Sequence, residues 1–355
     1  MQTRIINIDR ENISDELLRC AGKMLESGGL VAFPTETVYG LGGDALNCES
    51  SRKIYAAKRR PSDNPLIVHI HKWEDIYAIV SADAKHSQKL ATAKRIADRF
   101  WPGPLTMILP KSDLVPYETT GGLDTVAIRF PSDPIAQKLI EYAGGYVAAP
   151  SANASGKPSP TLAKYVVEDM DGRIDMIIDG GEVGIGLEST IIDLTVAPPQ
   201  ILRPGFITQE MLAEVLGEVD ADVTMLHAES GQAPKAPGMK YRHYAPKGDL
   251  TIVSGPQDLV VNYINQEASK AAAAGEKVGV VGTQEVLSQY HAQVVKSVGR
   301  RNDELSIARH LYTILREFDD EEVTRIYSES FEVEGLGQAI MNRLLKAAGH
   351  KVVQL

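Results

Sequence analysis

The sequence predicts an α/β protein made of two units: an open mixed sheet with helices, followed by a smaller, doubly wound α/β domain. With 355 residues the chain exceeds the usual size of one hydrophobic core, so two domains are expected. Strand-like and helix-like segments do not alternate one for one before residue 220, but they alternate regularly after residue 247. The segment between them has no sustained periodicity and is predicted to be a linker. The predicted domains are therefore 1–219 and 248–355, joined by a linker at 220–247.

The composition is that of an ordinary globular protein, with 43% hydrophobic and 24% charged residues. A formal net charge of −10 argues against binding nucleic acid by bulk electrostatics, although it leaves room for a local basic groove. Cys20 and Cys48 are the only cysteines, which indicates neither a disulfide framework nor a thiolate zinc site. No apolar run approaches the roughly 20 residues that span a bilayer, and the N-terminus does not resemble a signal peptide. We therefore expect a cytoplasmic protein that is not inserted in a membrane.

Hydrophobic periodicity assigns the elements of the first unit. Apolar positions at helical spacing predict helices at 13–27, 50–58, 84–99 and 133–142. Short apolar runs bounded by breakers predict strands at 30–33, 66–70, 105–109, 125–130, 146–149, 176–178, 189–194 and 200–203. In the second unit, strands are predicted at 250–253, 277–281, 294–298 and 325–327, and helices at 259–274 and 304–318. The regular alternation in this second set is typical of a doubly wound α/β domain.

The segment Phe33-Pro-Thr-Glu-Thr-Val-Tyr-Gly-Leu-Gly-Gly43 directly follows a predicted strand. Ligands commonly bind at strand ends in α/β sheets, because free backbone N–H groups and short side chains converge there. A tight turn that needs glycine for a positive φ explains the same residues. The pattern leaves both interpretations open.

Three cations stand together in Lys58-Arg-Arg60, where a predicted helix ends before a loop rich in proline. Cations in a last helical turn favourably oppose the helix dipole, which is one explanation. One helix end seldom needs three of them, so Lys58 and Arg60 are candidates for holding a triphosphate: lysine as a compact charge, arginine as a fork that grips two oxygens.

The segment Ser151-Ala-Asn-Ala-Ser-Gly-Lys-Pro-Ser-Pro-Thr161 also follows a predicted strand and is rich in small hydroxyl and amide side chains. Such a loop can bind phosphate oxygens or a ribose. It can equally be an exposed turn in which Ser159 or Thr161 caps the next helix.

Other nucleotide and metal signals are weak. His69 and His71 share a face if they lie on a strand, but no third zinc ligand stands nearby. Gly184 and Gly186 form a GxG without the full dinucleotide fingerprint. There is no P-loop and no GxSxG elbow. A bound nucleotide would therefore have to lie in an unusual set of loops.

Several motifs occur in a fixed order along the chain. They are Phe33-Pro-Thr-Glu-Thr-Val-Tyr-Gly-Leu41, Lys58-Arg-Arg-Pro61, Asn64-Pro-Leu66 with His69, Trp101-Pro-Gly-Pro-Leu-Thr106, Val126-Ala-Ile-Arg129, Ala149-Pro-Ser-Ala-Asn153, Ser159-Pro-Thr161, Leu187-Glu-Ser-Thr190 and Arg203-Pro-Gly205. In this order they resemble the threonylcarbamoyl-AMP synthase family with its YrdC-type catalytic domain, in the longer two-domain subclass. The resemblance covers about 12–208 and continues into 237–246, which is similar to the linker of that subclass. The last hundred residues match only in kind, as a Rossmann-like domain.

The resemblance implies a reaction in two steps. The amine of L-threonine captures bicarbonate or CO2 as a carbamate, and the carbamate attacks the α-phosphate of ATP and releases pyrophosphate. The product, threonylcarbamoyl-AMP, would serve the threonylcarbamoyl-adenosine modification of tRNA next to the anticodon. No covalent enzyme nucleophile is implied.

The resemblance also implies roles for individual residues. Thr35, His69, Arg129 and Ser189 would bind L-threonine, with Arg129 pairing with its carboxylate. Lys58 and Arg60 would act on the triphosphate as catalytic residues. The residues that would bind ATP are Lys58, Ser62, Thr125, Ala149, Ser151, Asn153, Ser159, Arg203 and Tyr244. No metal-binding residue is implied, but Mg²⁺ is expected to accompany ATP.

The expected ligands are ATP, L-threonine and bicarbonate or CO2, and the tRNA threonylcarbamoyl-transfer machinery is a further implied partner. Two alternatives stay open at this point. One is an RNA-binding module, in which case direct contact with tRNA is expected. Its basic surface would consist of the cluster 58–60 together with Arg52, Lys53, Arg129 and Arg203. The other is a carbamoyl-transfer or hydrogenase-maturation enzyme, because YrdC-type domains also occur there.

Overall fold

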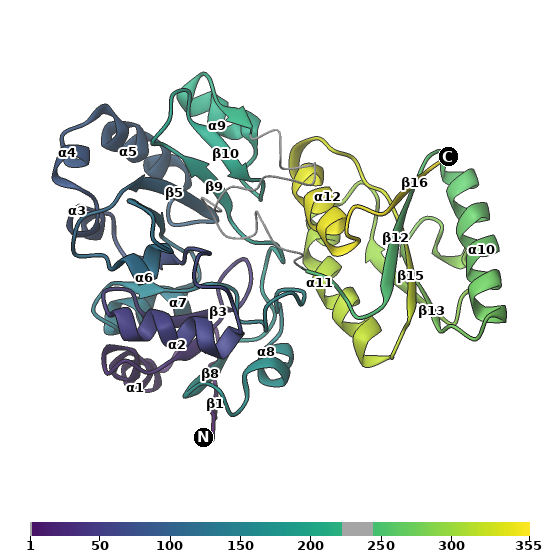
Figure 1. Cartoon of the computed structure of the whole chain (residues 1–355), viewed down its shortest axis with the longest axis horizontal. Coiled ribbons are helices and arrows are strands. Elements are labelled where there is room, and N and C mark those ends of the chain that lie inside the picture. Colours follow the sequence, from purple (N-terminus) through teal and green to yellow (C-terminus); the bar gives the residue numbers. More distant parts are fainter. Residues whose placement is uncertain (1, 222–243) are drawn as a thin grey trace.

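The structure, a computed structural model, describes residues 2–221 and 244–355 and contains two sheets, one in each of these parts (Figure 1). Helices flank both sheets, which confirms the predicted α/β class. Residues 222–243, most of the predicted linker 220–247, lie outside the described residues. The two predicted boundaries, at 219/220 and 247/248, therefore stay predictions.

The larger sheet has 11 strands of mixed direction, in the order β1-β8-β2-β3-β7-β4-β6-β5-β9-β10-β11. The strands that were predicted lie close to their expected bounds. In chain order the strands are β1 (Arg4–Asn7), β2 (Val31–Phe33), β3 (Gly40–Asp44), β4 (Ile67–His69), β5 (Leu105–Pro110), β6 (Thr125–Arg129), β7 (Val147–Ala148), β8 (Met176–Asp179), β9 (Thr190–Asp193), β10 (Gln200–Arg203) and β11 (Asp220–Ala221).

Strand β3 was not predicted, because it consists mostly of glycine. It pairs with β2 in antiparallel fashion, with Phe33 opposite Gly40. A Cβ on Gly42 would lie 2.9 Å from the ring of Phe33, so the strand is glycine-rich where its neighbour packs closely. The glycine-rich motif is thus a loop at residues 34–39 and a strand afterwards, and the open question of turn or ligand loop applies only to its first half.

Helices cover the larger sheet. Ser14 is the N-cap of α1 (Asp15–Glu26), and Arg59, in the left-handed region with φ 53°, is the C-cap of α2 (Cys48–Lys58). The helix predicted at 84–99 is two helices, because Ser87 begins a new one. Neither Ser159 nor Thr161 caps the helix that follows them, since its N-cap is Leu162. The remaining helices are α3 (Ile76–Ile79), α4 (Ala82–Lys85), α5 (Gln88–Phe100), α6 (Tyr117–Thr120), α7 (Pro134–Tyr142), α8 (Ala163–Met170) and α9 (Gln209–Leu216).

The smaller sheet is entirely parallel, in the order β14-β13-β15-β12-β16. Helix α10 covers one face, and α11 and α12 cover the other, so the doubly wound prediction is confirmed. α12 and β16 were not predicted. The elements are β12 (Asp249–Ser254), α10 (Gln257–Ala273), β13 (Val278–Thr283), β14 (Val294–Gly299), α11 (Glu304–Asp320), β15 (Arg325–Glu329), α12 (Gly335–Ala347) and β16 (Val352–Gln354).

Helices α11 and α12 lie between the smaller sheet and the larger unit, whereas α10 lies on the far side (Figure 1). The apolar core under α11 and α12 extends across this junction, because Val38, Leu187 and Tyr244 belong to it. The junction is close as well as apolar: a Cβ on Gly186 would lie 2.5 Å from the carbonyl oxygen of Ala308 in α11. The two units therefore share one packed interface.

No helix in the described parts of the chain is long and apolar enough to cross a membrane.

Candidate active site

A cavity opens where the parallel strands β4 and β6 end. His69 and Arg129 are the last residues of these strands and face each other in register. The cavity comprises about 680 Å³ of space not filled by protein, with open solvent at its mouth included. It is lined by Thr35, Val38, Gly40, Lys58, Arg60, Ile67, His69, Arg129, Ala149, Pro150, Ser151, Asn153, Ser155, Glu188, Ser189, Arg203 and Tyr244.

Arg129 supplies a buried guanidinium at one end of the cavity. Its side chain is 5% exposed, and its Nη2 lies 2.8 Å from Oε1 of Glu36. Within the described residues, neither Nε nor Nη2 of Arg129 makes a hydrogen bond, and neither oxygen of Glu36 does. Because a buried guanidinium fork with unused donors matches the geometry of a carboxylate, this end of the cavity suits a carboxylate ligand.

Three other residues predicted to bind threonine line the same cavity as Arg129. His69 is 3% exposed, and burial together with the charge of Arg129 lowers its pKa to about 3, so its ring is neutral. The hydroxyl of Ser189 lies 2.8 Å from that of Thr106. The hydroxyl of Thr35 donates to the carbonyl oxygen of Val38 at 2.7 Å and stabilises the turn before β3. The structure thus brings the predicted threonine set together in one cavity.

Lys58 and Arg60 also line the cavity, while Arg59 between them is exposed. The left-handed conformation of Arg59 at the end of α2 separates the two side chains. Lys58 is 1% exposed, and its Nζ donates to the carbonyl oxygens of Ser151 and Asn153. Burial, and then the charge of Arg60, lower the pKa of Lys58 well below its ordinary value. Burial also lowers the pKa of Arg60, to about 10.

The predicted nucleotide loop 151–161 lies beside Lys58. Ser151 donates to the side-chain oxygen of Asn153 at 2.5 Å, and the amide of Asn153 donates to the carbonyl oxygen of Lys157 at 2.8 Å. Arg203 donates from Nε to the carbonyl oxygen of Ser189 at 3.0 Å. Ala149 and Tyr244 complete this part of the lining. Hydrogen bonds within the loop therefore fix its shape next to Lys58, whose ammonium group its carbonyl oxygens accept from.

Three residues predicted to bind ATP do not line the cavity. Ser62 is exposed, and Thr125 is the first residue of β6, at the opposite end of that strand from Arg129. Ser159 is 1% exposed and lies behind the lining, where its hydroxyl donates to Oε1 of Glu188 at 2.5 Å. Roles for Ser62 and Thr125 stay predictions, and Ser159 reaches the cavity through Glu188.

Two carboxylates at the site had no role in the sequence analysis. Glu188 lines the cavity and Glu36 pairs with Arg129. Both lie inside motifs on which the family resemblance rests. An ionisable side chain in such a motif was the only feature of the sequence that could have marked them as site residues. Their partners could not be read from the sequence, because Arg343, which binds Glu188, lies 155 residues away along the chain.

The two histidines considered as a zinc pair do not form one site. His69 faces the cavity, whereas Nδ1 of His71 lies 2.8 Å from Oδ2 of Asp75. Within 2–221 and 244–355, no group of three or more His, Cys, Asp or Glu residues is placed to hold a metal ion.

A mixed α/β sheet with a cationic cavity at its strand ends is typical of α/β enzymes that bind anionic ligands. A family model described as telomere recombination, for Sua5, YciO and YrdC proteins, matches residues 23–205. A second model, described as the C-terminal domain of threonylcarbamoyl-AMP synthase, matches residues 207–349. The chain belongs to the threonylcarbamoyl-AMP synthase family, which consists of nucleotidyltransferase-type enzymes.

Relatives match over nearly the whole chain. The chain is 47% identical to threonylcarbamoyl-AMP synthase of Pyrococcus abyssi, covering 99% of this chain and 100% of that one. It is 46% identical to the Bacillus subtilis protein of the same name, covering 98% and 97%. The fold matches the crystal structure of P. abyssi Sua5 complexed with L-threonine with a TM-score of 0.92 at 46% identity, covering 99% and 100%. The predicted family and fold are confirmed.

Proposed function

We propose that the protein is an L-threonylcarbamoyladenylate synthase, which makes threonylcarbamoyl-AMP and pyrophosphate from L-threonine, bicarbonate or CO2, and ATP. The observation that carries the proposal is the placement of two cation sets in one cavity. Arg129 presents unused donors, and Lys58 and Arg60 line the same cavity. A cavity of this kind suits an amino acid carboxylate and a polyphosphate side by side. The name of the relatives and the threonine complex of P. abyssi Sua5 support the same substrates.

We assign the threonine subsite to Thr35, His69, Arg129 and Ser189. Arg129 binds the carboxylate with its fork, while the neutral ring of His69 and the hydroxyls of Thr35 and Ser189 orient the rest of the amino acid. A neutral His69 adds no positive charge beside the amine that must react. The chemistry then needs no enzyme nucleophile. The amine nitrogen bonds to the inorganic carbon, with loss of a proton if the carbon source is CO2 and of water if it is bicarbonate. A carbamate oxygen then bonds to the α-phosphorus as the bond to the pyrophosphate breaks.

We assign the triphosphate to Lys58 and Arg60, and the rest of the nucleotide to Ala149, Ser151, Asn153, Arg203 and Tyr244. The two cations neutralise charge that develops on the phosphate oxygens as pyrophosphate leaves. Holding the carbamate next to the phosphorus supplies the rest of the rate enhancement, because the reaction becomes effectively intramolecular. The chain's contribution is therefore binding, orientation and charge.

We propose that Mg²⁺ accompanies ATP. The carboxylate of Glu188 at the cavity is already bonded by Arg343 and Ser159, and the described residues include no cluster of metal ligands. These residues fit a Mg²⁺ ion that is held by phosphate oxygens and water, as is usual for this ion. When bound, it would neutralise part of the phosphate charge.

We extend the proposal to the use of the product. Threonylcarbamoyl-AMP is a mixed anhydride, which water hydrolyses, so a transfer machinery for threonylcarbamoyl-adenosine in tRNA has to consume it directly. We place this work in the cytoplasm, where ATP, L-threonine and tRNA occur together. An acidic chain with a net charge of −10 does not favour binding tRNA by bulk electrostatics.

The test is pyrophosphate release from ATP by the purified full chain, with L-threonine and bicarbonate omitted in turn. We expect release only when both are present and loss of release in Lys58→Ala. Release without threonine would contradict the proposal and favour carbamoyl transfer. Salt-sensitive tRNA binding without any pyrophosphate release would favour the RNA-binding alternative instead.

A further inference from the structure

Helix α11 of the C-terminal domain presents one polar stripe to the catalytic unit. Its members are spaced three, four and seven residues from the first, so they lie on a single helical face. Arg309 donates to the carbonyl oxygen of Gly184 at 2.8 Å, and the hydroxyls of Thr313 and Thr161 lie 2.8 Å apart. The stripe consists of Arg309, Tyr312, Thr313 and Arg316.

Arg316 binds the nucleotide loop 151–161 directly. The residue is 2% exposed, and its guanidinium donates to the carbonyl oxygen of Pro158 from Nη2 at 2.7 Å and from Nε at 3.0 Å. Its Nη2 also lies 2.6 Å from Oδ2 of Asp169. One buried side chain of the second domain thus fixes both the loop and the carboxylate behind it.

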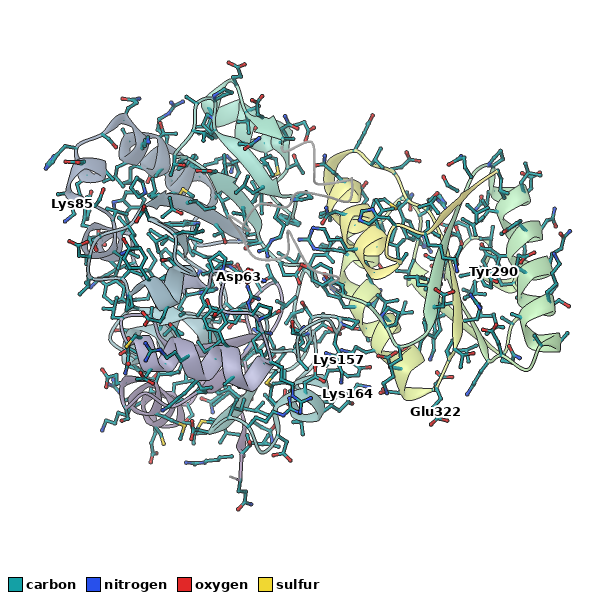
Figure 2. The ribbon with its side chains drawn as sticks, in the orientation of Figure 1. Asp63, Lys85, Lys157, Lys164, Tyr290 and Glu322 are labelled. Carbon is teal, nitrogen blue, oxygen red and sulfur yellow. The ribbon has the colours of Figure 1, made fainter. Side chains whose placement is uncertain are left out.

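Asp169 passes this constraint to the rest of the loop. It accepts from the backbone N–H of Ala154 at 3.0 Å and from Nζ of Lys157 at 2.6 Å. Lys157 lies at the junction of the two units in Figure 2. The amide of Asn153 bonds to the carbonyl oxygens of both Ala154 and Lys157, and the carbonyl oxygen of Asn153 accepts from Lys58. An unbroken series of contacts therefore runs from α11 to the cation assigned to the triphosphate.

A second route runs through Glu188. Its carboxylate accepts from Nε of Arg343 in α12 at 2.8 Å and from the hydroxyl of Tyr312 at 3.1 Å, and on its other side from Ser159. Burial raises the pKa of Glu188, but Arg343 and then Arg203 lower it more, to about 2. The carboxylate is therefore ionised, and it depends on a residue that is fully buried in the other domain.

Buried charges of this kind cannot lose one partner without rearrangement, because the remaining charge would stay desolvated and unpaired. None of the described residues of 248–355 lines the cavity, so they act on the ligand through residues that do, as these contacts allow. The two routes converge on loop 151–161 and leave Arg129 and His69, on β6 and β4, untouched.

We propose that Arg316 and Arg343 are positioning residues for the nucleotide, through which the C-terminal domain sets the shape of loop 151–161 and thereby the affinity for ATP. The inference rests on the proposed ATP-dependent function. Arg316 acts on loop 151–161, through Pro158 and Asp169, and contacts none of the residues assigned to L-threonine. Arg343 also reaches Ser189 through the neighbouring Glu188, so its replacement is expected to affect threonine as well.

The test compares the full chain with Arg316→Met, Arg316→Lys and Thr313→Val. Arg325→Met is the matched control, because Arg325 lies in the same domain and binds Glu276 and Asp249 away from the junction. We expect Arg316→Met to raise KM for ATP by about tenfold, the size of a typical coupling between contacting residues, with KM for L-threonine nearly unchanged. Arg316→Lys should recover part of the loss, and Thr313→Val, which removes one hydrogen bond, should shift KM for ATP less and in the same direction.

Calorimetric titration with a non-hydrolysable ATP analogue gives a second readout that needs no turnover. We expect weaker binding in Arg316→Met and unchanged binding in Arg325→Met. Equal analogue affinity in wild type, Arg316→Met and Thr313→Val, or equal changes in the two KM values, would overturn the inference. If the wild-type chain binds the analogue but releases no pyrophosphate with threonine, the proposed function fails while the titration still decides the positioning role. If the wild-type chain does not bind the analogue, both the proposed function and the positioning role are wrong.

Discussion

Nη2 of Arg129 and Oε1 of Glu36 lie 2.8 Å apart in a buried ion pair that lacks hydrogen-bond geometry. Both side chains are almost fully enclosed, so each charge depends on the other. A ligand carboxylate could use the donors of Arg129 that Glu36 leaves unused. The pair therefore marks the position where an amino acid is expected to bind.

Replacing Arg129 should affect threonine selectively. We expect Arg129→Met to raise KM for L-threonine by about 100-fold, since bonds to charged groups are each worth about 1.5–3 kcal/mol. KM for ATP should change much less. Initial rates of pyrophosphate release at varied concentrations of each substrate measure both. Arg129→Lys is the matched control. Its KM for L-threonine should lie between those of wild type and Arg129→Met, because lysine keeps the charge but lacks the forked pair of donors. Unchanged KM for threonine in Arg129→Met would exclude the assigned subsite.

His69 should stay neutral throughout the working range of pH. Its pKa is lowered to about 3 by burial and by Arg129. We expect its ring resonances in NMR spectra to stay constant between about pH 8 and 5, since an unperturbed histidine titrates near 6.5. A titration of these resonances near neutral pH would show that the ring is solvated and can be charged.

The lowered pKa of His69 also makes the stability of the folded chain depend on pH. The unfolded chain takes up a proton at His69 as the pH falls below about 6.5, whereas the folded chain does not until about pH 3. Stability from this group is therefore complete above pH 6.5 and is lost progressively as the pH falls through that window. We expect urea unfolding to show a smaller loss between pH 7.5 and 5 in His69→Gln than in wild type. Equal losses in the two proteins would contradict the assigned shift.

Binding of ATP should be accompanied by proton uptake. Burial lowers the pKa of Lys58 well below its ordinary value, and a polyphosphate beside it raises the pKa again. Calorimetry in two buffers of different ionisation enthalpy should therefore give different apparent binding enthalpies. Lys58→Met should abolish the difference if it still binds ATP detectably.

Lys346 provides the comparison for that experiment. Burial and the charges of Arg343 and Arg203 lower its pKa to about 7, so it is a second group that could take up a proton. Uptake that is lost in Lys346→Met and kept in Lys58→Met would assign the proton to α12 instead of the cavity.

Gly186 should be intolerant of a side chain. It has a φ of 89°, and a Cβ there would lie 2.5 Å from both the carbonyl oxygen of Ala308 and Cα of Arg309. We expect Gly186→Ala to lower the free energy of unfolding by about 1–3 kcal/mol, from backbone strain and a forced separation of the units. Gly184→Ala is the control, since its nearest neighbour would be 3.8 Å away. Denaturant unfolding measures the free energy of unfolding of both variants. Equal values would contradict the prediction and show that the junction accommodates a side chain at position 186.

The strands were predictable where apolar runs are bounded by breakers, as in β4 and β6, because burial on both faces leaves a continuous apolar signal. β3 was missed because glycines that permit close strand packing look like a turn. A single helix was predicted at 84–99 because the apolar residues before and after Ser87 keep helical spacing, although a new helix begins there. Local pattern does not report such tertiary requirements.

The candidate site divides in the same way. Lys58, Arg60 and Arg129 could be selected from residue type and motif order, and the cavity contains all three. The bonds that Tyr312 and Arg343 make to Glu188 could not be predicted, since α11 and α12 belong to a unit whose sequence resembled the family only in kind. Which cations face a cavity and which face solvent, as Arg59 does, depends on one left-handed residue at a helix end.

The polar stripe on α11 has a consequence for how such chains diverge. A buried arginine that binds a buried carboxylate in another unit cannot be exchanged alone, so Arg316 and Asp169, like Arg343 and Glu188, should be inherited as pairs. In an alignment of two-domain relatives, the identity at position 316 should therefore covary with that at 169, and 343 with 188. Chains that consist of the catalytic unit alone should be released from this constraint and should vary at 169 and 188 independently.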